Sequence, residues 1–168
     1  MAAEPKPKAA KKKKRRRAPR EEFVNYVAAI EDWEWSYSLL LHTDKHPADP
    51  YHEFRHLVIT ARLLRPAGLK TDRLEMSLLP TVGMNPGQRQ DREPLAVGSL
   101  EAYDDRIVGL IQIPIDVLPA ILQMLIAECF KFIVMGGDRL RHRRAPLHRF
   151  RLEMKLTDDD MPAEDAET

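Results

Sequence analysis

The stretch WEWSYSLLL, residues 33–41, alternates large apolar side chains with small or charged ones. Trp33, Trp35 and Tyr37 fall on one side of an extended chain, and Glu34 and Ser36 fall on the other. Because successive side chains of a β-strand point to opposite faces, this period of two predicts a strand with one apolar face. Aromatic residues are also favoured in strands. This strand needs a sheet in which its apolar face is buried, so the prediction of the fold starts from that sheet.

Further alternating runs follow along the chain. Residues 57–63 and 74–78 repeat the pattern, and the sequence Arg65-Pro66-Ala67-Gly68 between them predicts the turn of an antiparallel hairpin. Gly136-Gly137 is expected to end another strand. The remaining expected strands are residues 95–102 and 106–113, joined by a tight turn at 103–105, and residues 130–135 and 150–156. Together these runs predict an antiparallel sheet of five to seven strands.

One helix is expected to cover that sheet. Asp116 is suited to cap it, and Pro119 would fall in its first turn, where proline costs little. A short helical start is also expected over residues 21–30, where apolar side chains recur at helical spacing. The predicted fold class is α+β, with the main apolar helix packed on one face of the antiparallel sheet. The buried face of this helix is expected to comprise Leu118, Ile121, Leu122, Leu125, Ile126 and Cys129.

The charge distribution divides the chain into three parts. Residues 1–22 carry ten basic and three acidic side chains, a net charge of +7. Residues 158–168 carry six acids and no base, and residues 23–157 are neutral overall. Like-charge repulsion and few large apolar groups leave nothing to offset the entropy of ordering the ends. We expect a disordered basic arm (1–22), a single α+β domain (23–157) and a disordered acidic tail (158–168).

The basic arm contains the clearest functional signal. A flexible cationic segment neutralises phosphates and gains free energy from the release of counterions, without needing a defined geometry. The arm therefore indicates association with nucleic acid or another polyanion. An anionic lipid surface is another possible polyanion, although the arm has no acyl or amphipathic anchor and would bind it weakly alone. The alternatives are a solubilising tail and an arm for an acidic protein partner. Its consecutive bases are Lys11, Lys12, Lys13, Lys14, Arg15, Arg16 and Arg17.

A second cationic segment is rich in arginine. Arginine binds phosphate through two parallel hydrogen bonds, and this segment contains no lysine. On a strand, Arg139, Arg141 and Arg143 would project from one face as a stripe that follows a phosphate backbone. The alternative is an exposed strand edge whose charges prevent pairing with other chains. The acidic tail is a further candidate to occupy these sites. The arginine patch comprises Arg139, Arg141, Arg143, Arg144, Arg149 and Arg151.

Other chemistry is less well supported. The single cysteine, Cys129, excludes an intramolecular disulfide and a zinc site built from several thiolates. His42, His46, His52 and His56 lie close in sequence, but prolines interrupt them, so surface histidines are expected instead of a metal site. No nucleophile lies in an activating motif, and residues 83–87 do not form a phosphate loop. We expect no enzyme activity, cofactor or metal.

The compartment and the aromatic residues complete the prediction. The longest apolar stretch, residues 107–134, is interrupted by five polar or charged side chains, so no membrane insertion is expected. The protein is expected to be cytoplasmic, associated with the nucleoid, or nuclear in a eukaryotic source.

Trp33, Trp35 and Tyr37 would suit a base-stacking platform, although a core face is the favoured interpretation.

The sequence thus predicts a non-enzymatic, nucleic-acid-associated or regulatory protein. The arm would supply affinity and the arginine patch would orient the domain. The alternative is a protein-interaction or assembly module in which the charged ends set solubility and the rate of association.

Overall fold

A computed structural model describes most of the folded part of the chain. The described residues are 23–41, 51–81 and 96–160. The expected arm, residues 42–50 and 82–95, and residues 161–168 of the expected tail lie outside them.

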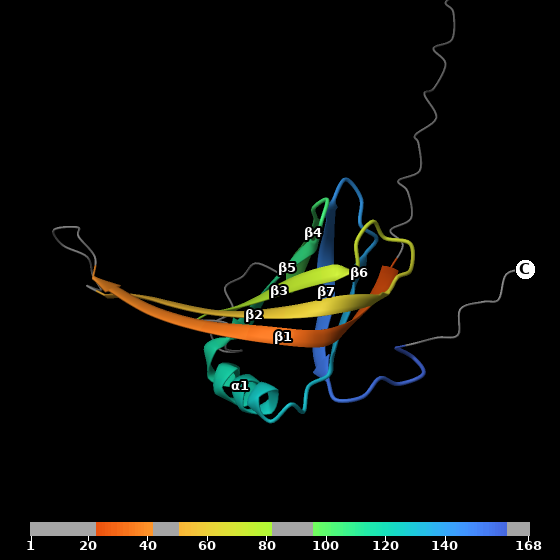
Figure 1. Ribbon diagram of the computed structural model, residues 1–168. Coiled ribbons are helices and arrows are strands. Elements are labelled where there is room, and N and C mark those ends of the chain that lie inside the picture. The colour runs from red at the N-terminus through yellow and green to blue at the C-terminus, as the bar shows by residue number, and fades with distance from the viewer. Residues whose placement is uncertain (1–22, 42–50, 82–95, 161–168) are drawn as a thin grey trace, which may run out of the picture.

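Within the described residues, seven strands close into a barrel (Figure 1). Neighbouring strands run antiparallel, apart from the third and fifth, which run parallel. The order around the barrel is β1-β2-β3-β5-β4-β7-β6, and the last strand pairs with the first. The strands are β1 (Phe23–Leu41), β2 (Tyr51–Arg65), β3 (Arg73–Thr81), β4 (Gly98–Ala102), β5 (Ile107–Pro114), β6 (Phe132–Asp138) and β7 (Arg144–Glu153).

The predicted α+β class is wrong, because the sheet closes on itself. A closed sheet buries its apolar face inside the barrel, so it needs no helix across that face. The helix α1 (Leu118–Ile126) follows a short 3-10 turn (Ile115–Val117), and only Leu118 and Leu125 of α1 are buried. The expected buried face is too broad, since the side chain of Ile126 is 68% exposed.

The two ends of the barrel differ. At one end lie the start of β1 and the turns that join β2 to β3, β4 to β5, and β6 to β7. We call this the turn end. At the other end, the helix end, α1 links the end of β5 to the start of β6 (Figure 1).

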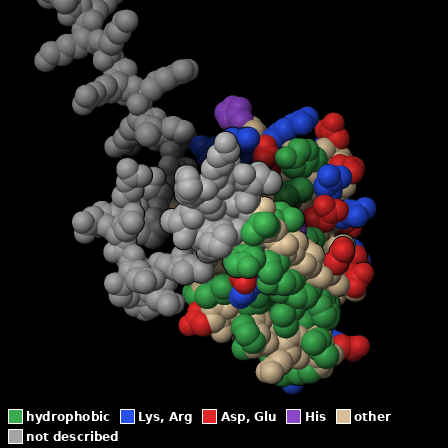
Figure 2. Space-filling view, turned by 90° about the vertical axis from the view of Figure 1, so that its left-hand side faces the viewer, with side chains coloured by type: hydrophobic (Ala, Val, Ile, Leu, Met, Phe, Trp, Pro, Cys, Tyr) green, Lys and Arg blue, Asp and Glu red, His purple; other side chains and the backbone are tan. Residues whose placement is uncertain are grey.

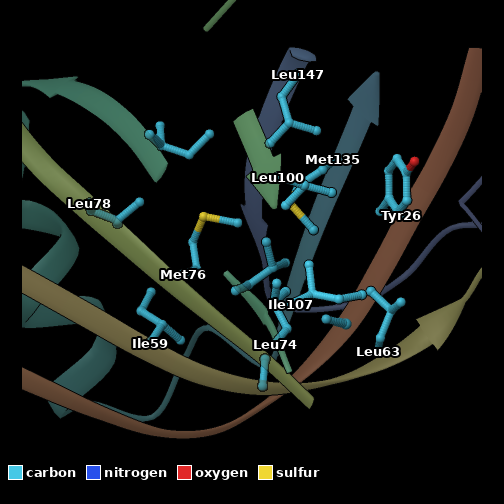
Figure 3. Close-up of a cluster of buried hydrophobic side chains, with 14 of the residues drawn as sticks. Tyr26, Ile59, Leu63, Leu74, Met76, Leu78, Leu100, Ile107, Met135 and Leu147 are labelled. Atoms are coloured by element: carbon cyan, nitrogen blue, oxygen red, sulfur yellow. The ribbon is translucent and has the colours of Figure 1, made fainter. Parts of the chain in front are cut away.

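The core fills the barrel with side chains from every strand. Alternation along β2 and β3 is confirmed: Leu57, Ile59 and Ala61 are fully buried, as are Leu74 and Met76. Figure 3 shows Ile59, Leu74 and Met76 in one cluster with labelled side chains from β4, β6 and β7. Burying each large apolar side chain contributes about 1.5–3 kcal/mol. The core holds the strands together and so fixes the positions of the turns between them.

The predicted helical start at residues 21–30 is wrong over its described part. These residues form the beginning of β1, which pairs with β6 from Phe23 to Ala29 and with β2 from Val27 onward. Two irregularities in the β1–β2 register, at Val27/Ala28 and at Ile30/Asp32, break the alternation of side chains. The resulting spacing of apolar residues imitates that of a helix, although these residues are paired in the sheet.

The far half of the β1–β2 pair extends beyond the barrel. Residues 36–41 of β1 pair with residues 51–56 of β2, whereas β2 pairs with β3 only from Leu57 onward. Figure 1 shows this pair of strands projecting past the other strands. We call it the projecting hairpin. Trp33 and Trp35 pack against the core as favoured, but Tyr37 is 52% exposed.

Candidate polyanion-binding site

The centre of the arginine patch is a tight turn between β6 and β7. The backbone amides of Arg141 and Arg144 each donate to the other residue's carbonyl, at 3.0 Å. His142 and Arg143 between them have positive φ angles of 51° and 69°. Two such residues make the turn that matches the right-handed twist of paired strands. The patch therefore begins at the tip of a hairpin.

The predicted stripe of Arg139, Arg141 and Arg143 on one strand face is wrong, since β6 ends at Asp138 and β7 begins at Arg144. Gly136-Gly137 does not end the strand before them but lies within β6. An added Cβ on Gly137 would lie 2.3 Å from the carbonyl oxygen of Pro146. The close approach of β7 at a register shift therefore explains the glycine.

The turn end brings this hairpin beside two other turns. One open hollow of about 230 Å³ is lined by Lys70 and Thr71 from the β2–β3 turn, Asp104 from the β4–β5 turn, and Arg143. A neighbouring hollow of about 300 Å³ is lined by Arg139, Tyr26 and the β2–β3 turn. Leu69 and Leu140 line both hollows, so the two lie next to each other at these side chains.

The start of β1 lies against the same patch. Phe23, which directly follows the basic arm in sequence, pairs with Asp138, the residue before Arg139. The guanidinium of Arg149 lies over the Phe23 ring, 5.9 Å from its centroid, and donates to the side-chain oxygen of Asn25 at 2.9 Å. The two cationic segments, far apart in sequence, are thus joined to one end of the barrel.

Two arginines of the patch are paired with exposed carboxylates. Arg143 lies 3.2 Å from Asp104, which also accepts a hydrogen bond from Lys70 at 3.0 Å. The hydrogen bond and charge of Lys70, with the charge of Arg143, hold the pKa of Asp104 below its usual value. Arg144 lies 3.0 Å from Glu101. Exposed pairs of this kind are screened by solvent and contribute little to stability, so a phosphate group can replace the carboxylate.

Arg151 lies apart from the turn end and is engaged internally. Its guanidinium donates to Asp160, whose carboxylate is buried, and lies 3.3 Å from Glu153. Burial acts to raise the pKa of Asp160, but hydrogen bonds from the Thr157 hydroxyl and amide and the charge of Arg151 outweigh it. The pKa therefore lies below its usual value. Within its described residues, the acidic segment thus occupies one arginine of the patch through Asp160.

Tyr26 positions the patch from inside the barrel, and sequence reasoning missed it. Its hydroxyl donates to the carbonyl of Asp138 at 2.7 Å and accepts from the amide of Leu140 at 3.0 Å. Burial raises the pKa of this phenol, so it remains an uncharged donor at neutral pH. To predict this role, one would have to know that Tyr26 pairs with Met135 of β6 in the sheet. Lys70 was missed because only the order of the strands brings its turn beside Arg143.

The predicted site residues thus separate into three groups. Arg139, Arg141, Arg143 and Arg144 lie at the turn end, with Arg149 beside the start of β1, and Arg151 lies apart. Lys11–Lys14 and Arg15–Arg17 lie outside the described residues. The turn end therefore supplies five of the six predicted arginines, among them Arg143 and Arg144 with their exposed carboxylate partners.

The histidines are only partly described. His42 and His46 lie outside the described residues, and His56 shares a hydrogen bond of 3.1 Å with the Ser77 hydroxyl. In the described ranges, no three side chains among His, Cys, Asp and Glu converge on a point that would hold a metal. The His56–Ser77 pair lines neither hollow at the turn end.

None of the helices in the described part of the chain is long and apolar enough to cross a membrane. Comparison of the chain with protein-family models, curated proteins and solved structures gives no match. The site is therefore interpreted from its own geometry and charge.

Proposed function

We propose that the protein is a non-enzymatic, nucleic-acid-associated protein of the cytoplasm or nucleoid that binds phosphate backbones at its turn end. The bases at 11–17 supply affinity that does not depend on nucleic-acid sequence. Arg139 and Arg141 in the β6–β7 hairpin, with Arg149 on β7, orient the barrel on the phosphate backbone. These contacts fix position, and none of them reads a base.

The observation that carries the proposal is the junction at Phe23. The residue that follows the basic arm pairs with Asp138 and lies under the Arg149 guanidinium. The chain that carries the bases at 11–17 is therefore attached to the barrel beside the hairpin's arginines, so one stretch of backbone can engage both. A tail that served only for solubility would have no reason to join the barrel beside a second cationic segment.

The strength of each arginine's ion pair indicates which arginines of the patch can bind phosphate. Arg143 and Arg144 each have a weak exposed carboxylate partner that a phosphate can replace. Arg151 is excluded, because removing it from the buried Asp160 carboxylate would leave that charge without its partner. The barrel would thus contribute a few contacts and the arm most of the charge.

The proposal is tested by fluorescence anisotropy with labelled duplex and single-stranded oligonucleotides over a series of salt concentrations. Full-length protein is compared with a full-length variant in which Lys11–Lys14 and Arg15–Arg17 are glutamine. Each contact to B-DNA phosphate contributes about 0.9 to the slope of log affinity against log salt, so the arm variant should lose about six in slope. The double variant Arg139→Gln/Arg141→Gln should lose about two.

The matched control is Lys131→Gln/Lys155→Gln, which removes two charges beside the helix end, just before β6 and just after β7. It should bind as the unchanged protein does. Failure of the full-length protein to bind at low salt would refute the proposal. Equal losses in the control and the Arg139/Arg141 variant would show that net charge acts without the turn end.

A further inference from the structure

One edge of the projecting hairpin has no neighbouring strand among the described residues. β1 pairs with β6 only as far as Ala29, and the amide of Ile30 then donates to the carbonyl of Lys131 at 2.8 Å. From Asp32 to Leu41 the chain pairs with β2 on one side and with no described strand on the other. This row of backbone donors and acceptors is a template for another strand.

The sequence of this edge lacks the usual protection against pairing. Residues 35–41 contain no charge, proline or glycine. The opposite edge of the hairpin, residues 51–56 of β2, carries Glu53 and Arg55, which lie 2.6 Å apart in an ion pair. Charged side chains and proline are the common means of blocking an exposed edge. The β1 edge is therefore the one that is open to a partner.

Apolar side chains surround the open edge. Figure 2 views the molecule from the side toward which the hairpin projects and shows apolar side chains gathered on that face. The exposed apolar side chains of the hairpin lie on both of its faces: Tyr37, Leu39, Leu41 and Tyr51 on one, and Leu40 and Phe54 on the other. Their exposed fractions are 52% for Tyr37, 51% for Leu39, 57% for Leu40, 67% for Leu41, 56% for Tyr51 and 45% for Phe54. A soluble domain rarely exposes so many large apolar side chains without a partner.

We propose that residues 35–41 of β1 pair antiparallel with the same residues of a second copy of the chain, about a twofold axis at Ser38. In this register Trp35 lies opposite Leu41, and Tyr37 lies opposite Leu39. Opposite residues in antiparallel strands share a face, so the apolar side chains of the two copies meet on one side. The paired segment coincides with the uncharged segment.

The charges next to this segment favour a second copy in the antiparallel direction. Glu31, Asp32 and Glu34 lie on the barrel side of the segment. Parallel pairing of two copies would place each acid opposite itself, which is destabilising. Antiparallel pairing about Ser38 places the acids of the two copies at opposite ends of the paired segment, so they do not face one another. The edge is thus better matched to itself in the antiparallel direction, which gives a closed twofold interface.

The interface lies at the opposite end of β1 from the start of the barrel at Phe23. In the proposed dimer the two turn ends point away from each other and both remain accessible. The inference is therefore independent of the polyanion proposal. Either can fail while the other holds.

The test is sedimentation velocity of full-length, nucleic-acid-free protein at high salt over a wide range of concentrations. The decisive variant is Ser38→Lys, which places two lysines opposite each other at the axis, on an exposed position outside the core. The control is Ser99→Lys, at an exposed position of β4. The unchanged protein and the control should shift from the mass of one chain to that of two as concentration rises, whereas Ser38→Lys should remain a monomer.

A protein that stays monomeric at every concentration would overturn the proposal and would indicate a strand of a different protein as the partner. Dimerisation of Ser38→Lys equal to that of the control would overturn it as well, by showing that another surface is used.

A crosslinking experiment tests the register. Cys129 is the only cysteine, so Cys129→Ser/Ser38→Cys has a single thiol. Opposite residues of antiparallel strands have Cα atoms about 4.5–5.5 Å apart, which a disulfide can span. Mild oxidation should give a covalent dimer with this variant and not with Cys129→Ser/Ser99→Cys. A dimer that forms without the Ser38→Cys crosslink would contradict the axis at Ser38.

Discussion

The two halves of the β1–β2 pair have similar sequences and different surroundings. In the barrel half, Leu57 and Ile59 are fully buried, because β3 and β6 flank the pair and the closed sheet surrounds their side chains. In the projecting half, Tyr37 and Leu39 continue the same alternation, yet each is about half exposed. Local pattern thus makes both halves strands, and closure of the barrel decides which half is core.

The largest expected difference between the halves is in packing. Ile59→Ala removes a fully buried side chain and should lower the free energy of unfolding by about 2–5 kcal/mol. Leu39→Ala, on the projecting hairpin, should change it by less than about 0.5 kcal/mol in dilute monomer. Urea denaturation measures both. Equal effects would mean that the hairpin folds back onto the barrel.

Buried and exposed carboxylates should differ in the same way. Asp160→Asn weakens the hydrogen bonds that Asp160 accepts from Thr157 and Arg151 and should cost about 1–3 kcal/mol. Asp104→Asn removes an exposed partner of Lys70 and Arg143 and should leave the free energy of unfolding unchanged within error. A large effect at Asp104 would contradict the description of the turn-end ion pairs as exchangeable.

The pH dependence follows from the lowered pKa of Asp160. Because the pKa in the folded protein lies below the unfolded value, the carboxylate stabilises the fold above about pH 4 and loses that effect as the pH falls through the folded pKa. Asp160→Asn should therefore flatten the acid limb of the stability curve below about pH 4. An unchanged acid limb would show that other carboxylates control it.

The smallest expected difference concerns two tyrosine hydroxyls. Tyr26→Phe removes hydrogen bonds to Asp138 and Leu140 inside the turn end and should cost about 1–2 kcal/mol. Tyr37→Phe removes only an exposed contact to Glu53 at 3.4 Å and should have no measurable effect. Thermal unfolding of the pair of variants makes the comparison. A neutral Tyr26→Phe would remove the role of Tyr26 in holding the turn.

The sequence predicted most of the strands and neither the closure nor the site geometry. Alternation identified β2 and β3, because each keeps a strict period of two between clear turn residues. It failed at the start of β1, where register irregularities disturb the period. The parallel pairing of β3 with β5 is a long-range contact that no local pattern encodes. Closure of the barrel therefore could not be predicted. The helix was expected to cover the sheet only because the sheet was expected to be open.

The residues of the arginine patch were predicted from the composition of the sequence, but their arrangement in space was not. Arg139 to Arg144 were recognised as a cationic segment, yet the positive φ angles of His142 and Arg143 carry no glycine or asparagine signal. The pairing of Arg151 with Asp160 and the nearness of Phe23 to Arg149 depend on the fold.

The central claim is that the turn end and the projecting hairpin act separately, the first on polyanions and the second on another copy of the chain. It is tested most directly by sedimentation velocity of a labelled duplex with three full-length proteins: the unchanged chain, the arm variant with glutamine at 11–17, and Ser38→Lys. The account predicts that Ser38→Lys binds the duplex as a monomer, with an unchanged salt dependence, while the arm variant dimerises and leaves the duplex free. Loss of both properties in either variant would contradict the separation.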